Sequence, residues 1–520
     1  MLILKSMQSA WTGSVGPLRT KARQFPKNKL FDVVIIGCGI SGLTAALLLK
    51  KAGRTVAVID KASVGSGESG HTTAHITELI DSGYHELISH FGENGARMAR
   101  ESSRAAIDQI ARNVHEHGID CYFSRVPAYI YCESKKQRQE LERELEALHR
   151  VGIKSAKLVQ DVPLPFRTFA GVRVPDQAQF HPALYYKGLA EAIERDGCSI
   201  FENTFARNVS DGNLCSVDTD RGDIRARRVL VLTDTPMSTR FLMHTKIANY
   251  RTYALAATYT ESVAPGLFWD TADPYHYTRT QEMPDGTSLL IIGGEDHKTG
   301  MKRDTNESFD KLERWSRERF SIRNVRYHWS GQIVEPVDGL PFIGRSPLSR
   351  NVYLATGYSG NGMTFGTLAG MILSDQVLEQ ENSWSALYDA SRVKVFGSAT
   401  TFVSENKDFP LCLFRDRVSP PEVTSLEEIP SAEGRIAKVN GERLAVFRDS
   451  RGELHAVSPA CTHLGCHVRF NKAEESWDCP CHGSRFGING EVLHGPAVSA
   501  LRKVDVPEES RKAKPKKTAA

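Results

Sequence analysis

The order of apolar and polar residues predicts alternating strands and helices at the front of the chain. Residues 31–36 (FDVVII) form a short apolar run typical of a buried strand, and residues 55–60 (TVAVID) form a second one. Between them, residues 43–53 (LTAALLLKKAG) have the pattern of a helix. A strand, a helix and a strand in this order predict the start of an α/β domain.

The end of the chain has a different pattern. Short runs of alternating apolar and polar residues occur at 434–439, 442–449 and 453–458, separated by Asn-Gly and Arg-Gly pairs. Alternation with a period of two predicts antiparallel strands, and the glycine pairs predict the turns between them. These runs are therefore predicted to belong to a small all-β domain.

A charged helix is predicted between these two regions. Residues 133–149 (ESKKQRQELERELEALH) place Leu141, Leu145 and Leu148 on one helical face. A single narrow apolar stripe on an otherwise charged segment is typical of a surface helix rather than a coiled coil. The chain shows no internal repeats, and the pattern does not predict an oligomeric state.

Composition and charge exclude several classes of protein. A chain of 520 residues, with 40% hydrophobic and 25% charged residues, predicts several globular domains rather than a disordered chain. No apolar run reaches the ~18 residues that a membrane span needs, so no integral membrane segment is expected. The net charge of +4 comes from residues 1–30 and 511–520, which contain eleven Lys and Arg and no acid. The remainder is net acidic, so no nucleic-acid partner is expected.

The basic N-terminal segment does not have the features of an export signal. Residues 1–30 lack an apolar h-region and an adjacent Arg-Arg pair, which predicts a cytoplasmic protein. Two interpretations stay open: a solvated arm whose true start is Met7, and an organellar transit peptide. The arm is favoured.

The ten cysteines are too few for a disulfide scaffold. Six have no regular spacing and are expected to be buried small apolar residues: Cys38, Cys121, Cys132, Cys198, Cys215 and Cys412. The other four occur in two short segments, 461–466 (CTHLGC) and 479–484 (CPCHGS), each of which also contains one histidine. Cysteine and histidine side chains in two loops can bind a metal, and tetrahedral zinc is one possibility.

The two segments resemble those of the Rieske family. In such a centre two thiolates bind one iron and two imidazoles bind the other. The resemblance implies that Cys461, His463, Cys479 and His482 bind a [2Fe–2S] cluster. It also implies a disulfide between Cys466 and Cys481.

The same resemblance bears on the reduction potential of the cluster. Ser484 matches a serine that donates a hydrogen bond to a cluster sulfide, whereas Phe486 stands where high-potential members have a tyrosine. Fewer hydrogen bonds to the sulfurs lower the potential, so a value below that of those members is expected.

The first apolar run leads directly into a glycine-rich turn. Gly37, Gly39 and Gly42 follow the strand and open the helix, and Asp60 ends the second strand. Such glycines allow the backbone to approach a pyrophosphate at a helix N-terminus, and the acid can accept from ribose hydroxyls. This stretch predicts a dinucleotide and leaves NAD and FAD open.

Four further segments resemble the D-amino-acid oxidase and glycine oxidase superfamily, which binds FAD. They are the Gly/Ser/Thr-rich loop 65–75, Phe180-His-Pro182, residues 329–331 with 338–344, and the glycine-rich turn 355–364. The resemblance implies the following FAD-binding residues: Gly37, Gly39, Ile40, Ser41, Gly42, Asp60, Lys61, Ser69, Gly70, His71, Thr72, Gly357, Gly362, Met363 and Thr364. His71 occupies a position at which some members link FAD covalently, although noncovalent binding is favoured here.

These resemblances divide the chain into five parts. They are a basic arm (1–30), an FAD-binding domain of Rossmann-like α/β type (31–395), a linker (396–420), a Rieske domain (421–506) and a basic tail (507–520). An antiparallel substrate sheet is expected to be interleaved in the FAD-binding domain at about 120–330.

The combination resembles a bacterial family of FAD-dependent oxidoreductases that carry a Rieske module. It implies that a small substrate, an amine or amino acid, gives a hydride to FAD, and that electrons leave singly through the cluster. The acceptor, a one-electron acceptor protein or O₂, is not identified by the sequence. A nonenzymatic electron carrier or redox sensor, and a plain oxidase with a structural Rieske domain, remain alternatives.

Catalytic residues are not identified by the sequence either. The candidates for substrate contact on the predicted sheet are Arg251, Tyr253, Tyr275, Tyr277, Arg279, Glu295, Asp296 and His297. Each of them could equally be a structural strand residue.

Overall fold

The computed structural model describes residues 7–16, 18, 20–21, 24–26, 29–237, 243–393, 420–439 and 441–505. The predicted linker lies outside these residues except for residue 420. The predicted basic tail and Cys412 lie entirely outside them. The chain groups into a larger unit (1–236, 251–296 and 309–401) and a smaller unit (237–250, 297–308 and 402–520). Two segments from the middle of the sequence therefore group with the C-terminal part.

The larger unit contains a mainly parallel sheet with the order β16-β17-β10-β1-β2-β7, and β8 and β9 extend it from β10. The predicted strands are present as β1 and β2, and their residues pair in parallel from Val33 with Val56 to Ile36 with Ile59. The bounds are β1 Leu30–Ile36, β2 Val56–Ile59, β7 Ser199–Phe201, β8 Ala206–Ser210, β9 Cys215–Thr219, β10 Gly222–Val231, β16 Phe342–Arg345 and β17 Val352–Thr356.

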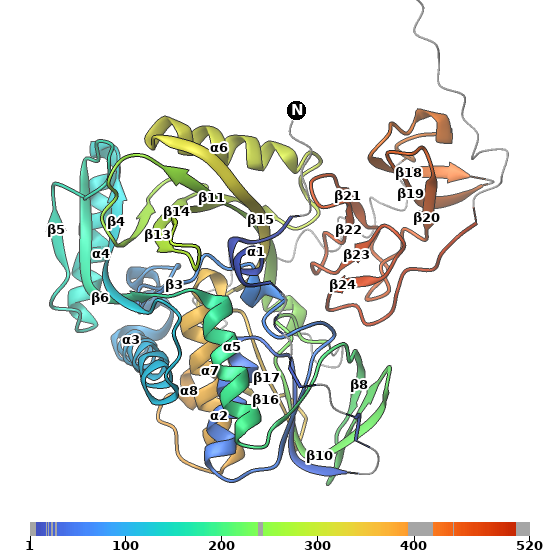
Figure 1. Ribbon diagram of the computed structural model, residues 1–520, viewed down its shortest axis with the longest axis horizontal. Helices are drawn as coiled ribbons and strands as arrows, with labels where there is room; N and C mark the ends of the chain where they lie inside the picture. Colours follow the sequence, from blue (N-terminus) through green and yellow to red (C-terminus); the bar gives the residue numbers. More distant parts are fainter. Residues whose placement is uncertain are drawn as a thin grey trace, which may run out of the picture. The chain divides into compact units, whose positions relative to one another are not determined.

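Helix α2 (Ile40–Lys51) lies between two other helices, α5 (Pro182–Arg195) and α7 (Gly362–Val377), as Figure 1 shows. Close packing of α2 and α7 depends on a glycine, because a Cβ at Gly370 would lie 2.7 Å from the Thr44 side chain. Further helices are α3 Tyr84–His117, α4 Arg138–Arg150, α6 Asn306–Arg319 and α8 Ser385–Tyr388. Helix α4 covers most of the segment predicted to be a surface helix.

A second sheet has the order β15-β11-β14-β13-β12-β4-β6-β3, with β5 beside β6. It is mostly antiparallel. Its strands extend from residue 75 to residue 336, so the sheet uses more of the sequence than the predicted range of about 120–330. Its strands are β3 His75–Ile76, β4 Ser124–Cys132, β5 Lys157–Val159, β6 Ala170–Gln179, β11 Ile247–Tyr259, β12 Leu267–Asp270, β13 His276–Glu282, β14 Ser288–Lys298 and β15 Ile322–Pro336. The first four residues of β11 and the last two of β14 group with the smaller unit.

The N-terminal segment is not a wholly solvated arm, which corrects the prediction for residues 1–30. Residues 10–15 form helix α1 (Ala10–Val15), and the side chain of Trp11 is completely buried. Its indole packs edge-on against Trp329 and His181. Burial of an apolar indole is favourable, and the residues around Trp11 (7–16) contain no Lys or Arg that would oppose it.

The smaller unit contains two antiparallel sheets. The first has β18 Glu433–Val439, β19 Glu442–Arg448 and β20 Leu454–Val457, which correspond to the three predicted runs. The second has β21 Arg469–Asn471, β22 Ser476–Asp478, β23 Arg485–Gly487 and β24 Val492–His494. Their core contains Phe447, Trp477 and Phe486, and the predicted all-β character is confirmed.

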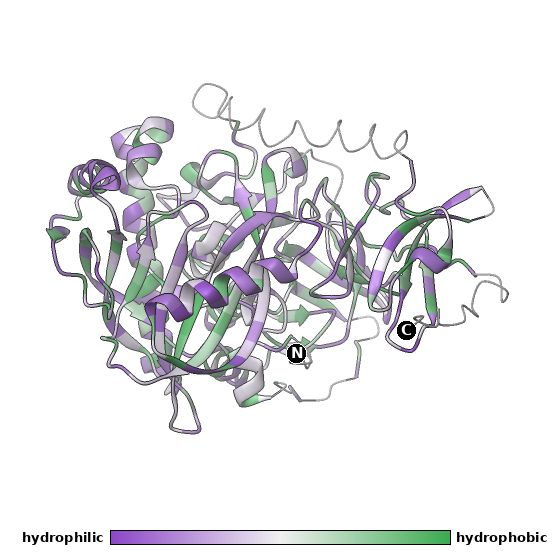
Figure 2. Cartoon of the chain, turned by 90° about the horizontal axis from the view of Figure 1, so that it is seen from above, coloured by the Kyte–Doolittle hydropathy of each residue, from purple (hydrophilic) through white to green (hydrophobic). Residues whose placement is uncertain are grey.

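Hydropathy agrees with this arrangement. In Figure 2 hydrophobic residues are concentrated in the strands of the larger unit, and hydrophilic residues cover its outer helices and loops. None of the described helices combines the length and the apolarity that crossing a bilayer requires. The five irregularly spaced cysteines within the described residues are all buried, as predicted: Cys38, Cys121, Cys132, Cys198 and Cys215.

Candidate active site and metal centre

The glycine-rich turn after β1 has the close backbone approach that its sequence predicts. Gly37 has φ +112°, and a Cβ there would lie 2.2 Å from the carbonyl oxygen of Leu232. A Cβ at Gly42 would lie 2.0 Å from the carbonyl oxygen of Gly37. Only glycine fits at these two positions, because backbone atoms cannot move aside as a flexible side chain can. Gly39 precedes the first turn of α2.

Asp60 and Ser69 hold this turn in place. The Asp60 carboxylate accepts hydrogen bonds from the backbone N–H of Cys38 (2.7 Å) and of Ala62 (2.9 Å). Burial raises its pKa. The backbone N–H of Ile40 donates to Ser69 Oγ (3.2 Å). Two residues of the predicted set therefore organise the N-terminal end of α2, where an anion is favoured.

Three other members of the predicted set surround this turn or line the following loop. Ser41 Oγ lies 3.1 Å from the Tyr358 hydroxyl, which connects α2 to the turn before α7. Lys61 is exposed. Gly70 is buried, and a Cβ there would lie 2.4 Å from the carbonyl oxygen of Gly65.

The loop 65–75 is held by two indoles. Trp329 Nε1 donates to the carbonyl oxygen of His71 (2.8 Å), and Trp11 Nε1 donates to that of Thr72 (2.5 Å). The His71 ring lies 2.9 Å from the carbonyl oxygen of Gly67 through Nδ1. A Cβ at Gly67 would have no protein atom within 4 Å, so the loop leaves open space beside it.

The second glycine-rich turn leads into α7. Gly357 has φ +79°, and Gly362 is the first residue of the helix. A Cβ at Gly362 would also meet no protein atom within 4 Å. The backbone N–H groups at this helix start are therefore next to open space, as an anionic or electron-rich ring would require. Both open positions fit a bound FAD.

The neighbours of Gly362 attach the turn to other elements. The Tyr186 hydroxyl donates to Met363 Sδ (3.2 Å). Thr364 Oγ1 donates to the carbonyl oxygen of Thr77 (2.9 Å) and accepts from the Thr77 backbone N–H (3.2 Å). Thr364 therefore positions the segment that begins at Thr77, whereas Met363 contacts α5 through Tyr186.

This attachment brings Asp81 to the glycine-rich turn, a residue that the sequence did not single out. Its carboxylate accepts a hydrogen bond from the backbone N–H of Gly360 (2.5 Å), and its own N–H donates to Asn361 Oδ1 (3.0 Å). Surrounding protein atoms raise its pKa, but the side chain is exposed, and solvent moderates that shift. Its position, rather than its titration, is the informative observation.

Asp296 on β14 lies near Asp81. The negative charge of Asp81 contributes to raising the pKa of Asp296 to about 7, after burial, which is the larger cause. Asp296 is hydrogen-bonded to Thr252, whose hydroxyl lies 2.7 Å from that of Tyr277. Its Oδ1 is shielded from solvent and has no hydrogen-bond partner within the part of the chain that the structure describes. The nearby carboxylate of Asp81 and the lack of a hydrogen-bond donor to Asp296 Oδ1 both favour the binding of a cationic group beside Asp296.

Tyr277 and its neighbour Tyr275 complete this face of the sheet. Their ring centroids lie 5.6 Å apart, and Tyr277 also packs against the buried His75. Burial lowers the pKa of His75 to about 3, and the charge of Arg279 contributes, so this imidazole is neutral. No sequence pattern identifies His75 as a site residue, apart from its place at the end of the loop 65–75.

The structure gives structural surroundings to the other substrate candidates. Arg279 is completely buried and donates to the carbonyl oxygens of Thr73 (2.6 Å) and Phe180 (3.0 Å) and to Gln281 Oε1 (2.6 Å). Burial lowers its pKa to about 9. These donors are used by the fold, which disfavours Arg279 as a carboxylate-binding residue.

Four candidates remain to be placed. Arg251 is buried and donates to Ser330 Oγ, and Tyr253 packs against Phe309 with a centroid distance of 4.8 Å. Glu295 Oε1 lies 3.4 Å from His276 Nε2. His297 groups with the smaller unit, apart from the others.

In the smaller unit, two loops bring together the four residues that resemble Rieske ligands. Cys461 and His463 follow β20, whereas Cys479 and His482 follow β22. The two thiols are hydrogen-bonded to each other, and the two imidazole centroids lie 4.9 Å apart. Each loop closes on itself, since the backbone N–H of Gly465 donates to the Cys461 carbonyl oxygen and that of Gly483 to the Cys479 carbonyl oxygen.

The protonation states suit metal binding. The hydrogen bond from Cys479 lowers the pKa of Cys461 to about 7 and raises that of Cys479, so the buried pair holds one thiolate readily. Burial lowers the pKa of His463 to about 3 and that of His482 to about 4. Thiolates and neutral imidazoles are the forms that bind metals, and these residues fit a metal cluster.

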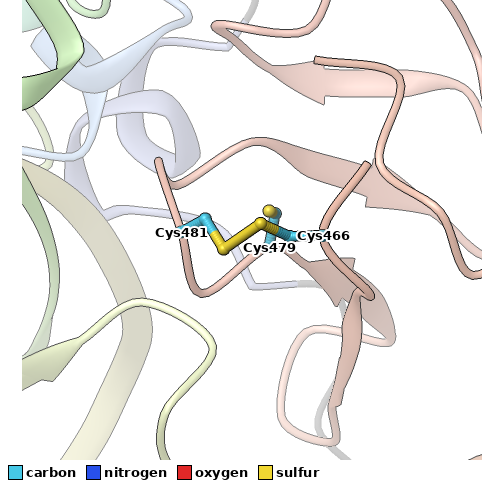
Figure 3. A group of neighbouring side chains, drawn as sticks. All are labelled: Cys466, Cys479 and Cys481. Carbon is cyan, nitrogen blue, oxygen red and sulfur yellow. A yellow bond between two sulfur atoms is a disulfide. The ribbon is translucent and has the colours of Figure 1, made fainter. Parts of the chain in front are cut away.

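Beside these residues, Cys466 and Cys481 form a disulfide, the pair that the resemblance implies. Its Cα atoms are 6.6 Å apart, and it joins the two loops. Figure 3 shows the sulfur of Cys479 next to it. The Ser484 hydroxyl accepts from the Ala497 backbone N–H (3.1 Å) and also reaches Cys461, and Phe486 is completely buried.

Comparison with known proteins identifies the class. Residues 32–376 match the family described as FAD dependent oxidoreductase (DAO), and residues 419–505 match the Rieske [2Fe-2S] domain. The chain belongs to the DAO family of FAD-dependent oxidoreductases and carries a C-terminal Rieske domain. It is an enzyme of the oxidoreductase class whose domains bind FAD and a [2Fe–2S] cluster, so the zinc alternative is disfavoured.

One relative matches nearly the whole chain. The "Putative Rieske 2Fe-2S iron-sulfur protein YhfW" of Bacillus subtilis (strain 168) is 35% identical over 480 residues, which cover 91% of this chain and 93% of the relative. Gamma-glutamylputrescine oxidoreductase of Escherichia coli (strain K12) is 24% identical over 359 residues, covering 66% and 83%. The crystal structure of glycine oxidase from Geobacillus kaustophilus is similar in fold, with a TM-score of 0.59 at 18% identity, covering 70% and 99%.

Proposed function

We propose that this enzyme oxidises a small amine or amino acid and passes the electrons singly through the Rieske cluster to an acceptor. Bound FAD supplies a two-electron acceptor for a hydride, and the bound cluster supplies a one-electron carrier. The observation that carries the proposal is the presence of both cofactor domains in one chain. The names of two similar proteins, gamma-glutamylputrescine oxidoreductase and glycine oxidase, support a nitrogen-containing substrate.

The site residues are part of this proposal. FAD is held by the turns at 37–42 and 357–364, by Asp60 and Lys61, and by residues 69–72. The cluster is bound by Cys461, His463, Cys479 and His482. The disulfide between Cys466 and Cys481 fastens the two cluster loops to each other.

Asp296 is proposed as the group that receives the proton of a substrate ammonium. A neutral amine gives up a hydride more readily than an ammonium ion, so the proton has to leave first. With a pKa of about 7, Asp296 can accept that proton near neutral pH, and its Oδ1, which has no hydrogen-bond partner among the described residues, offers the acceptor atom. Asp81, next to the glycine-rich turn, adds a second negative charge that attracts the cation.

An anaerobic screen of amines and amino acids tests this function. A substrate should bleach the flavin absorbance near about 450 nm, whereas a nonenzymatic carrier or sensor would show no bleaching with any of them. A plain oxidase would transfer the electrons to O₂ and form one peroxide for each substrate molecule oxidised. It would not need the cluster.

The role of the cluster is tested by replacing one ligand. Cys479→Ser should abolish the cluster, leave bleaching by substrate intact and slow turnover with a one-electron acceptor. Substitution is preferable to deletion of the Rieske domain, because residues 243–250 and 297–308 group with that domain and would lose their packing. Turnover at the unchanged rate would place the cluster outside the pathway. A cytoplasmic location remains a prediction.

A further inference from the structure

Two segments far upstream of the Rieske domain are part of the smaller unit. They are residues 243–249, which include the first residues of β11, and residues 299–305, which follow β14. We call them together the upstream bracket. They are joined to each other, since the backbone N–H of Thr299 donates to the carbonyl oxygen of Asn249 (2.9 Å).

The bracket contacts the loop that carries Cys479 and His482. Asn249 Nδ2 donates to the carbonyl oxygen of His482 (2.9 Å) in a buried position. Gly300 approaches the same loop so closely that a Cβ would lie 2.9 Å from the backbone nitrogen of Pro480 and 3.0 Å from the carbonyl oxygen of Asp478. Only glycine, with φ +72°, fits between these backbone atoms.

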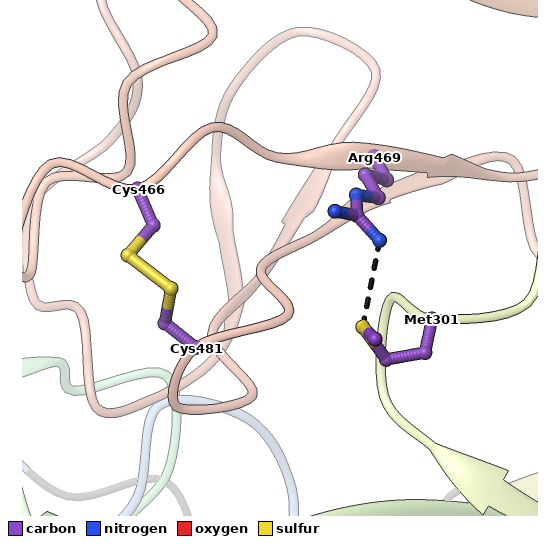
Figure 4. The surroundings of a disulfide bond; sticks show 4 residues. All are labelled: Met301, Cys466, Arg469 and Cys481. Atoms are coloured by element: carbon purple, nitrogen blue, oxygen red, sulfur yellow. Dashed lines mark hydrogen bonds between the residues drawn. A yellow bond between two sulfur atoms is a disulfide. The ribbon is translucent and has the colours of Figure 1, made fainter. Parts of the chain in front are cut away.

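The bracket is also attached to the second sheet of the Rieske domain. Arg469 on β21 donates to the carbonyl oxygen of Gly300 (3.3 Å) and to Met301 Sδ (3.4 Å), the latter shown in Figure 4. Thr305 Oγ1 donates to Asn471 Oδ1 (2.7 Å) and accepts from the Ala473 backbone N–H (2.8 Å). Thr305 and Asn471 are both almost completely buried, so these polar groups are matched as they are in a protein core.

His244 lies over the two imidazoles. Its ring centroid is 4.6 Å from that of His463, with the planes at 80°, and 5.7 Å from that of His482. His244 is 7% exposed and His482 is 8% exposed, whereas the side chain of His463 is partly exposed. The Nε2 atom of His463 is shielded from solvent, although it has no hydrogen-bond partner among the described residues.

We propose that the upstream bracket is a built-in docking surface for the cluster-bearing loops, and that His244 covers part of the imidazole edge of the cluster and so limits the access of external molecules to it. The proposal rests on the ligand set given under Proposed function. The approach of an external one-electron acceptor to this edge is then hindered by the chain itself. The bracket is continuous in sequence with the second sheet, because His244 shortly precedes β11 and residues 299–305 directly follow β14.

The test uses the full chain with both cofactors, after complete reduction, and ferricyanide as the probe. Freeze-quenched EPR follows the signal of the reduced cluster. This signal is lost when each cluster transfers one electron to ferricyanide. His244→Ala should accelerate this oxidation several-fold, since the edge becomes more accessible. His244→Phe keeps a ring over the imidazoles and should behave like the wild type.

A spectroscopic readout accompanies the rate. After exchange into D₂O, ENDOR of the reduced cluster should show stronger coupling to exchangeable deuterons in His244→Ala than in the wild type or His244→Phe. His455→Ala is the matched control, because His455 is hydrogen-bonded to Asn489 (3.1 Å) at a different part of the same unit. Neither its oxidation rate nor its deuteron couplings should change.

Other outcomes overturn the proposal. Wild-type rates and couplings in His244→Ala would show that His244 does not cover the edge, and equal effects in His244→Phe would show that the ring is not what covers it. If His244→Ala assembles no cluster, Asn249→Ala, which loosens the bracket, carries the test and should also accelerate oxidation. Iron and sulfide content and substrate bleaching are measured separately, so a failure of the proposed function would be recognised as such.

Discussion

The disulfide between Cys466 and Cys481 is expected to stabilise the two cluster loops by an amount that the sequence separation determines. The bridge closes a loop across 15 residues. In the chain-entropy account, a loop of this length removes about 3 kcal/mol of conformational freedom from the unfolded state at 25 °C. Replacing both cysteines by alanine should therefore lower the free energy of opening of this region by about 3 kcal/mol.

Hydrogen exchange followed by mass spectrometry measures this effect in the intact holoprotein. Peptides that cover residues 461–486 report the local opening free energy when closing is faster than exchange. Because each ~1.4 kcal/mol is a factor of ten, exchange in the double variant should be roughly a hundredfold faster. The Cys466→Ala and Cys481→Ala single variants should show nearly the full effect, since either one removes the bridge.

Cys121→Ala provides the matched control, because Cys121 is a buried free cysteine of the larger unit. In the Cys121→Ala variant, the hydrogen-exchange rate of peptides covering residues 461–486 should equal that of the wild type. Iron content has to be measured for every variant, so that loss of the cluster is distinguished from loss of the bridge. Unchanged exchange in a double variant that retains iron would refute the reasoning, since it would mean that the loops are held by other interactions.

Three further predictions concern the larger unit and the cluster potential. Asp296→Asn should lower kcat/KM for the substrate by a factor of about 10²–10⁴. In the wild type, kcat/KM should fall about tenfold for each pH unit below about 7, because the protonated carboxyl group of Asp296 cannot accept a proton. A kcat/KM that does not change with pH would exclude this role of Asp296. Trp11→Ala should cost about 3–5 kcal/mol of stability in thermal or denaturant unfolding, whereas a solvated arm would lose nothing. Phe486→Tyr should raise the reduction potential in protein-film voltammetry by offering a hydrogen bond to sulfur, and an unchanged potential would contradict the expectation.

Much of the fold could be predicted because the relevant signals are local. The apolar runs at 31–36 and 55–60, the glycines between them, and the alternating runs after residue 433 act through neighbours in the sequence. The N-terminal segment was misjudged for a related reason. Its charge pattern predicts solvation, whereas the burial of Trp11 depends on Trp329 and His181, which are distant in the sequence.

The candidate substrate site could be predicted only in part. Asp296 was one of eight equivalent candidates, because a strand residue gives no sign of what faces it. Arg279 had the chemistry of a carboxylate-binding residue, but carbonyl oxygens of Thr73 and Phe180 occupy its donors. Asp81 was missed, since its significance comes from a hydrogen bond to Gly360 across 279 positions.

The sequence alone determined the local motifs, and their resemblance to known families implied the two cofactor classes and the residues that bind them. Glycine turns and Cys/His pairs are encoded within a few positions, because steric access and ligand geometry at such sites depend on the local backbone. The tertiary structure alone decided which groups meet across the chain: Asp81 with the turn before α7, and His244 with His463. Such contacts depend on strand order and packing, and those are set by burial of the whole apolar core rather than by any single segment.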